Sequence, residues 1–236
     1  MKVLPAVDIL QGRCVQLVQG DRERATFYGE PKHCAKRWIE EGADALHIIN
    51  LDGAFGEAEK NVALIRRLIK DSDVTIQLGG GIRSVNDATS WLDMGVERII
   101  LGTLAVRNPT IITVLAREYG SQRIVAGVDT RSGQIVVEGW MKPVGDYLSW
   151  AQEFVKVGAG LLLFTNVDLE GLQQGILSEP IKRIMGVVSI PVIVAGGIAH
   201  IHDIIELKAL GVHGVVLGSA LYSAKISLGA ALEAAK

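Results

Sequence analysis

The stretch LGGGIR, residues 78–83, decides the fold, because a similar stretch, VAGGI, recurs at residues 194–198. The offset between equivalent glycines is constant: 196 − 80 = 116, 211 − 95 = 116 and 218 − 102 = 116. The same offset relates a second motif, N-x-D, which occurs at Asn50/Asp52 and at Asn166/Asp168. A repeat of half the chain is much longer than a solenoid repeat of roughly 20–50 residues. It predicts two equivalent half-domains with the same glycine-rich loops.

Short apolar runs alternate with longer amphipathic stretches around these motifs. The predicted strands are Val3–Val7, Ala45–Ile49, Val74–Leu78, Arg98–Leu101, Ile124–Val128, Gly160–Phe164, Pro191–Ala195 and Gly214–Leu217. The predicted helices cover residues 31–41, 60–70, 84–94, 109–119, 146–157, 178–186, 200–210 and 219–234. Strands this rich in Val, Ile and Leu are typical of parallel sheets buried on both faces. An open doubly wound sheet would show the same alternation. The repeat favours an α/β fold closed as a (β/α)8 TIM barrel, because two four-stranded halves then leave no exposed edge.

Length and composition agree with one such barrel. The chain has 236 residues, of which 49 % are hydrophobic, so we expect a single domain over residues 1–236, with half-barrels of about 1–122 and 123–236. A net charge of −2 gives no indication of a nucleic-acid partner or an anionic membrane. We expect no membrane span, because no apolar run approaches about 18 residues, and no signal peptide, because Asp8 interrupts the N-terminal apolar segment. Cys14 and Cys34 form no disulfide framework and no metal-ligand spacing. We therefore expect a cytoplasmic protein, and we expect it to be a monomer.

Two connections are unusually long. Residues 9–30 follow the first strand and residues 130–145 follow the fifth, which are corresponding places in the two halves. Each contains an alternating stretch, Arg13–Val18 or Gln134–Glu138, that predicts a small hairpin. Long loops after barrel strands lie at the catalytic end. Their matching positions favour lids over tolerated surface insertions.

A carboxylate ends the first strand and another ends the fifth: Asp8 in PAVDI and Asp129 in AGVDT. Strand alternation places Asp8 on the same face as Ala6. Strands one and five lie opposite each other in an eight-stranded barrel, so the two carboxylates would face each other across its mouth. Each Asp alone could cap a local turn, but the symmetric pair favours acid–base catalysis.

The glycine loops follow strands three, four, seven and eight. Backbone N–H groups, a helix N-terminus and a hydroxyl are available in each half, which is a typical anion site. Single glycines often serve only turns or close packing, but four loops at a fixed offset favour phosphate binding. The predicted phosphate-binding residues are Gly80, Gly81, Gly102, Thr103, Gly196, Gly197, Gly218 and Ser219. The simplest ligand is a small bisphosphorylated molecule that spans both halves.

The loop after the sixth strand carries more candidates. Thr165 ends this strand, where it could bind a substrate hydroxyl or orient a catalytic carboxylate, although threonine also suits strands in general. Asp168 and Glu170 follow and offer a third carboxylate near the mouth.

Three further side chains are candidate binding residues. Arg83 follows the first glycine loop and could pair with phosphate or a catalytic Asp. Trp140, in the long loop after strand five, could stack on a heterocycle or pack the lid. His47 could be a polar contact at the cavity floor or a core histidine. His200 and His202 diverge on a helix, and we expect no metal.

The chain resembles a known family in several motifs taken together. They are PAVDIL, CVQLVQGD, LHIINLDGAFG, IQLGGGIRS, GTLAV, AGVDT, VVEGW and IVAGGI, and they extend over essentially the whole chain. In this order they resemble the phosphoribosylformimino-5-aminoimidazole carboxamide ribotide isomerases of histidine biosynthesis. The resemblance implies an Amadori rearrangement of a bisphosphorylated aminoaldose to its aminoketose, and it implies no cofactor.

The resemblance also implies catalytic roles. It makes Asp8 the general base that removes the C2 proton, and Asp129 matches the usual proton donor. A carboxylate five residues past the threonine of strand six can also be the acid. This chain has Glu170 there, where the family commonly has Asp, and it has Asn50 and Asn166 where the family often carries Asp. Both acid assignments stay open.

Three alternatives remain at this stage. The sister cyclase of imidazole glycerol phosphate synthase usually begins with Cys-Leu-Asp, whereas this chain has Ala6-Val7-Asp8. A dual-substrate isomerase would also act on phosphoribosyl anthranilate. A non-enzymatic phosphate-binding barrel is disfavoured, because both strand-end Asp residues are present.

Overall fold

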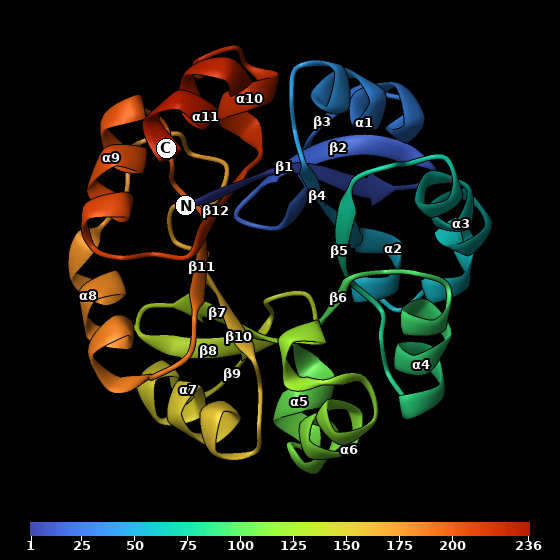
Figure 1. Cartoon of the computed structure of the whole chain (residues 1–236), viewed down its shortest axis with the longest axis vertical. Helices are drawn as coiled ribbons and strands as arrows, with labels where there is room; N and C mark the ends of the chain where they lie inside the picture. Colours follow the sequence, from blue (N-terminus) through green and yellow to red (C-terminus); the bar gives the residue numbers. More distant parts are fainter.

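The computed structural model describes residues 1–236, and it forms a closed barrel of eight parallel strands surrounded by helices (Figure 1). The strands are β1 (Lys2–Leu10), β4 (Ala45–Asn50), β5 (Thr75–Gly79), β6 (Arg98–Leu101), β7 (Ile124–Arg131), β10 (Leu161–Asn166), β11 (Val192–Ala195) and β12 (Gly214–Leu217). Each pairs with the next in this order, and β12 pairs with β1. The last pairing closes the ring. It confirms the predicted (β/α)8 barrel and excludes the open doubly wound sheet.

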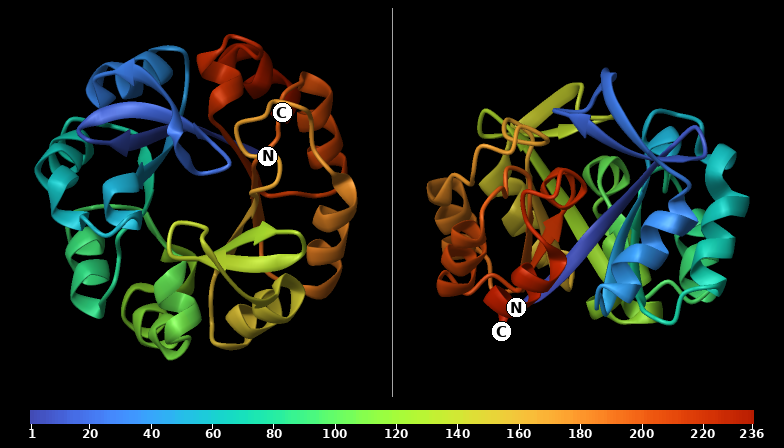
Figure 2. Two further views of the ribbon diagram at one scale, coloured as in Figure 1. Left: turned by 180° about the vertical axis from the view of Figure 1, so that it is seen from behind. Right: turned by 90° about the horizontal axis from the view of Figure 1, so that it is seen from above.

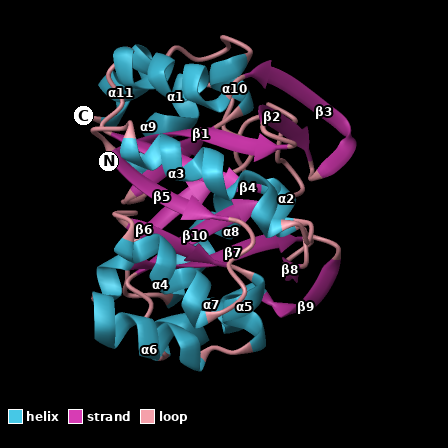
Figure 3. Cartoon of the chain, turned by 90° about the vertical axis from the view of Figure 1, so that its right-hand side faces the viewer, coloured by secondary structure: helices cyan, strands magenta, loops and turns pink.

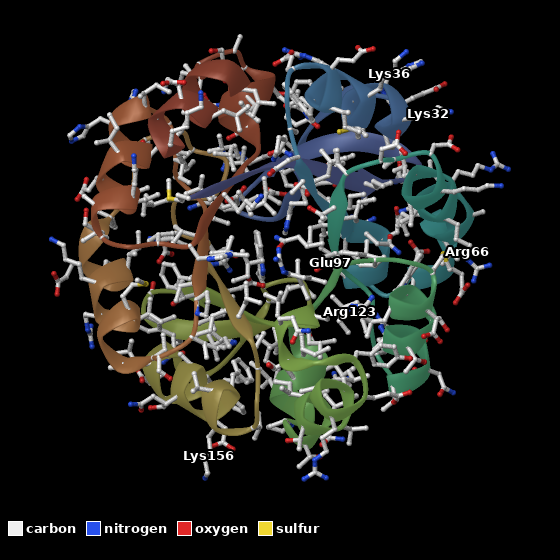
Figure 4. All side chains as sticks on the ribbon, in the orientation of Figure 1. Lys32, Lys36, Arg66, Glu97, Arg123 and Lys156 are labelled. Carbon is white, nitrogen blue, oxygen red and sulfur yellow. The ribbon has the colours of Figure 1, made fainter.

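Helices lie around the outside of the strand ring (Figure 1). The longer ones are α1 (Pro31–Glu40), α3 (Val62–Lys70), α4 (Val85–Asp93), α6 (Thr110–Tyr119), α7 (Tyr147–Lys156), α8 (Ser178–Val187), α9 (Ile201–Ala209) and α11 (Leu228–Ala235). Charged side chains of this layer, such as Lys36, Arg66 and Lys156, point away from the barrel (Figure 4). None of the helices is long and apolar enough to cross a membrane.

The structure differs from the predicted helices in two respects. Short helical segments that the sequence pattern did not predict lie in several connections. They are α2 (Leu51–Ala54) and η1 (Ala58–Asn61) between β4 and α3, α5 (Thr103–Arg107) after β6, and η2 (Ser121–Arg123) before β7. The single helix predicted over residues 219–234 is wrong. It is divided into α10 (Ser219–Tyr222) and α11, because Ala224 between them has φ 57 and a helix cannot continue through this conformation.

Two hairpin extensions rise from one end of the barrel. β1 continues into antiparallel β2 (Arg13–Val18) and β3 (Asp21–Gly29), and β7 continues into β8 (Gln134–Val137) and β9 (Lys142–Asp146). Figures 2 and 3 show both extensions at the end opposite the chain termini. The two predicted hairpins are therefore present, and each has a further strand. The half-barrel boundary near residue 122 stays a prediction.

Two apolar layers hold the barrel. The larger cluster lies between strands and helices and includes Trp38, Phe154 and Phe164. A smaller cluster comes from the inward faces of the strands and includes Ala6 and Val125. Because side chains alternate along a strand, Asp8 and Asp129 lie on the inward faces of β1 and β7, two and four residues beyond these apolar positions. The fold thus brings both carboxylates to the end of the barrel that carries the hairpins.

Candidate active site

A cavity of about 820 Å³ opens at the end of the barrel that carries the hairpin extensions. Fifteen of the residues that the sequence singled out as catalytic or binding candidates line it, and Asp168 does not. They are Asp8, His47, Gly80, Gly81, Arg83, Gly102, Thr103, Asp129, Trp140, Thr165, Glu170, Gly196, Gly197, Gly218 and Ser219. This common location makes one site for them possible, while the role of each residue stays a prediction.

Asp8 lies where β1 leaves the barrel and pairs with β2. In that register Asp8 is opposite Val15, and the side chain of the next residue along β2 also reaches it: Gln16 Nε2 donates a hydrogen bond to Asp8 Oδ2 at 3.0 Å. Burial raises the pKa of Asp8 from 3.8 to about 7, and the hydrogen bond from Gln16 partly offsets this. Asp8 therefore changes its charge near neutral pH.

Asp129 lies two residues before the end of β7, which is four strands from β1 in either direction around the ring. Trp140 Nε1 donates a hydrogen bond to Asp129 Oδ2 at 2.8 Å, and Thr165 on β10 is its register neighbour. Burial raises the pKa of Asp129, while hydrogen bonds with Thr165 and Trp140 lower it. These donors favour the ionised form of the carboxylate.

Glu170 is the third carboxyl group in the cavity, and the loop after β10 positions it. Its backbone carbonyl accepts a hydrogen bond from the Gln19 N–H at 2.9 Å. The next residue, Gly171, has φ +73 and lies so close to Leu17 that an added Cβ would be 2.4 Å from the Leu17 carbonyl oxygen. Burial, and then the negative charges of Asp8 and Asp129, raise the pKa of Glu170 from 4.5 to about 8. Glu170 is therefore mainly protonated at pH 7.

Close packing explains part of the glycine pattern. Gly80 and Gly196 both have φ +89, and an added Cβ would lie 2.2 Å from the Asn50 carbonyl oxygen and 2.5 Å from that of Asn166, respectively. No side chain fits there. These two glycines are thus required by the fold itself, whether or not the loops bind phosphate.

Gly102 requires a different explanation. An added Cβ at Gly102 would meet no protein atom within 4 Å, so the space beside it is open cavity. The adjacent Thr103 hydroxyl accepts a hydrogen bond from the Glu138 N–H at 3.0 Å, and Arg107 forms an ion pair with Glu138 at 2.8 Å. A hydroxyl, an arginine and open space beside a backbone without a side chain are suitable for a phosphate group.

The remaining candidates have distinct surroundings. His47 is buried at the cavity floor, where its Nδ1 lies 2.7 Å from Gln77 Nε2, and burial lowers its pKa to about 4. The imidazole is therefore neutral at pH 7. Arg83 donates to the Gly53 carbonyl at 3.2 Å rather than to a catalytic carboxylate. Asp168, which the sequence placed near the mouth together with Glu170, does not line the cavity.

The sequence reasoning missed several cavity residues. Gln16, the partner of Asp8, is one of them, and Arg22 and Arg107 also line the cavity. The alternation along Arg13–Val18 was a signal for a strand, but the identity of the residue facing Asp8 depends on the register with β1. Neither arginine lies in a motif that would have indicated its position.

The arrangement supports acid–base chemistry on a phosphorylated molecule. Three carboxyl groups share one cavity, and burial raises the pKa of each. Carboxyl groups whose pKa values are raised toward neutral pH can accept or donate protons there. The glycine loops that follow β5, β6, β11 and β12 border the same space.

Comparison with known proteins identifies the family of this chain. Residues 2–227 match the family described as histidine biosynthesis protein. The chain is 61 % identical over 193 residues, 82 % of each chain, to a protein of Methanosphaerula palustris, and 58 % identical over 193 residues, again 82 % of each, to one of Methanoregula boonei. A protein of Halobacterium salinarum is 44 % identical over 192 residues, 81 % of this chain and 79 % of that one. All three carry the name 1-(5-phosphoribosyl)-5-((5-phosphoribosylamino)methylideneamino)imidazole-4-carboxamide isomerase. With a match that covers nearly its whole length, this chain belongs to the histidine biosynthesis protein family.

Proposed function

We propose that this chain is the aldose–ketose isomerase of histidine biosynthesis that its relatives are named for. It converts the bisphosphorylated aminoaldose into the corresponding phosphoribulosyl aminoketose by an Amadori rearrangement. The observation that carries the proposal is the cavity in which three carboxyl groups with raised pKa lie among the glycine loops that follow β5, β6, β11 and β12. The names of relatives up to 61 % identical support the same reaction.

The reaction moves protons without any net change in atoms. An acid protonates the ring oxygen, the C1–O bond breaks, and the nitrogen lone pair forms a protonated imine at C1. A base then removes the C2 proton, and the electrons of that bond form the C1=C2 bond of an enaminol. Finally C1 gains a proton and the C2 hydroxyl loses one, which yields the ketone. The enzyme must therefore present an acid at the ring oxygen and a base at C2.

The electrostatics favour particular residues for these roles. Asp8, with a pKa of about 7, is partly ionised at neutral pH and is the proposed base. Glu170, with a pKa of about 8, is mainly protonated and is the proposed acid. Asp129 accepts the Trp140 hydrogen bond as a carboxylate would, so we assign it the stabilisation of positive charge on the imine. Asp129 as the acid is the competing assignment.

The two phosphate groups of the substrate would occupy the two halves of the cavity. Gly102 and Thr103 serve one of them, with Arg107 available for charge pairing, and Gly218 and Ser219 serve the other. The reaction needs no external oxidant or reductant, because C2 is oxidised while C1 is reduced within the same molecule, and the predicted absence of a cofactor is consistent with this chemistry. A cytoplasmic location, a monomeric state and the absence of nucleic-acid binding stay predictions.

A turnover assay tests the proposal directly. The purified protein is given the bisphosphorylated aminoaldose and, in parallel, phosphoribosyl anthranilate, each followed spectrophotometrically. Turnover of the first substrate alone is expected. Turnover of both would require a dual-substrate isomerase, and turnover of neither would overturn the proposal. The Asp8→Asn variant serves as the control for contaminating activity, because it should bind the substrate but not convert it.

A further inference from the structure

The N-x-D motif that repeats at an offset of 116 has no role in the chemistry described above. In the first half, Asp52 is buried with 1 % of its surface exposed, in the segment that follows β4. Its Oδ2 accepts a hydrogen bond from the backbone N–H of Gln11 at 2.6 Å. Gln11 belongs to the turn between β1 and β2. The N-x-D motif that follows β4 therefore holds the hairpin extension of the neighbouring strand, β1.

The second half repeats this contact. Asp168 Oδ2 accepts a hydrogen bond from the backbone N–H of Ser132 at 2.7 Å, and Ser132 begins the turn between β7 and β8. The acceptors are related by 168 − 52 = 116, and the donors by 132 − 11 = 121. The second offset is also that of the catalytic pair, since 129 − 8 = 121. The two contacts are therefore equivalent in the two halves.

Both turns have a backbone that needs support. Gln11 has φ 52 and Ser132 has φ 50, and each precedes a glycine with positive φ, Gly12 or Gly133. Two successive residues with positive φ fit the tight hairpin turn that matches the twist of a sheet. A residue other than glycine is strained there. A carboxylate that accepts its N–H stabilises this conformation and fixes where the hairpin begins.

Each hairpin carries the hydrogen-bond donor of one strand-end carboxylate. The β1–β2 turn sets the register that brings Gln16 to Asp8. Next to the β7–β8 turn, Arg131 donates to the Trp140 carbonyl at 3.0 Å, and the Trp140 ring donates to Asp129. Contacts thus connect Asp168 through the Ser132 turn, Arg131 and Trp140 to Asp129. In the other half, contacts connect Asp52 through the Gln11 turn and Gln16 to Asp8.

We propose that Asp52 and Asp168 are positioning residues, one in each half-barrel, which hold the hairpins so that Gln16 and Trp140 keep their hydrogen bonds to Asp8 and Asp129. This inference rests on the proposed function for its effect on turnover, but not for its effect on the structure of the hairpins. Asp168 is the better residue to test, because it is partly exposed, whereas Asp52 is buried and also accepts a hydrogen bond from Asn61 at 2.8 Å.

The test compares Asp168→Ala with Asp168→Asn. The alanine variant removes the acceptor, so kcat should fall about tenfold while KM changes less than about threefold, as expected when a reacting group is displaced but substrate binding remains. The asparagine variant keeps an acceptor oxygen and should restore kcat to within about threefold of the wild type. Equal kcat values for Asp168→Ala and the wild type would overturn the inference, and so would equal losses in both variants.

A second readout does not depend on the substrate. The fluorescence of Trp140 is obtained by subtracting, from the spectrum of each protein, the spectrum of the same protein with Trp140→Phe. This difference is measured for the wild type, Asp168→Ala, Asp168→Asn and Ser227→Ala. The emission of Trp140 should shift in Asp168→Ala and not in Asp168→Asn. An unchanged Trp140 spectrum in Asp168→Ala would overturn the positioning role even if the wild type had no isomerase activity. The two failures are therefore distinguishable.

Two further variants complete the design. Ser227→Ala removes a side-chain acceptor from the start of α11, where the Ala230 N–H donates at 3.3 Å, and it should leave kcat and the Trp140 emission unchanged. Asp52→Ala should lower kcat by at least as much as Asp168→Ala. If the buried site does not tolerate alanine and this variant fails to fold, the Asp168 pair alone decides the inference.

Discussion

Replacing Asp8 with asparagine should stop catalysis and at the same time stabilise the fold at alkaline pH. The pKa of Asp8 is raised from 3.8 to about 7, chiefly by burial. The folded protein therefore holds this proton more tightly than the unfolded chain does. The free energy of unfolding therefore falls as the pH rises from the pKa of Asp8 in the unfolded chain to its pKa in the folded protein. Above pH 7 the full destabilisation caused by the buried negative charge is present. Asparagine carries no charge and removes that cost.

The expected gain follows from the two pKa values. The difference between about 7 and 3.8 is roughly 3 pH units, which at about 1.36 kcal/mol per unit gives an upper bound of about 4 kcal/mol. Asp8 faces a cavity open to solvent, and screening lowers the cost, so we expect about 1–2 kcal/mol. For a chain of this size 1 kcal/mol changes Tm by roughly 2–4 °C. Tm should therefore rise by about 2–8 °C at pH 8, and by much less near pH 4.5.

Thermal unfolding followed by circular dichroism at one scan rate measures this gain. The wild type and Asp8→Asn are compared at pH 8 and pH 4.5. Asp71→Asn is the matched control, because Asp71 is an exposed carboxylate whose pKa is lowered by its ion pair with Lys32. That variant should gain nothing at pH 8. A gain for Asp8→Asn that is equal at both pH values, or absent at pH 8, would refute the assignment of its raised pKa to burial.

Three further predictions concern the cavity and its loops. The pH profile of kcat/KM should be bell-shaped, with an acidic limb near pH 7 from Asp8 and an alkaline limb near pH 8 from Glu170. The Glu170→Gln variant should lack the alkaline limb. A profile of this variant with the alkaline limb intact would rule out Glu170 as the acid. In Gln16→Leu the hydrogen bond that lowers the pKa of Asp8 is lost, so the acidic limb should move to higher pH in the same assay. Gly80→Ala should cost several kcal/mol in urea unfolding, because its Cβ would lie 2.2 Å from a carbonyl oxygen. Gly95→Ala is the comparison, because an added Cβ at Gly95 meets nothing within 4 Å. This variant should lose only about 1 kcal/mol of unfolding free energy, because residue 95 has a positive φ.

The internal repeat and the apolar runs of the sequence were sufficient to predict the barrel. Eight strands, their order and the end at which Asp8 and Asp129 emerge follow from local patterns, because buried parallel strands need continuous apolar segments and side chains alternate along them. The glycine loops were predictable for the same reason, since they directly follow these strands. The C-terminal helix was wrong because its interruption at Ala224 is a backbone conformation without a glycine or proline to indicate it.

The sequence by itself determined which strand ends and glycine loops meet at the cavity, and the tertiary structure decided which other side chains reach it and what each of them contacts. Asp168 and Glu170 are two residues apart in one loop. Yet Asp168 holds the turn at Ser132, whereas Glu170 lines the cavity with the two strand-end carboxylates, whose charges raise its pKa. In a loop the directions of side chains do not follow a regular period of the sequence. Here the direction of the Glu170 side chain is set by the packing of the next residue, Gly171, against Leu17 of β2. The pKa values were likewise beyond the sequence, because burial and neighbouring charges come from segments that meet only when the barrel closes.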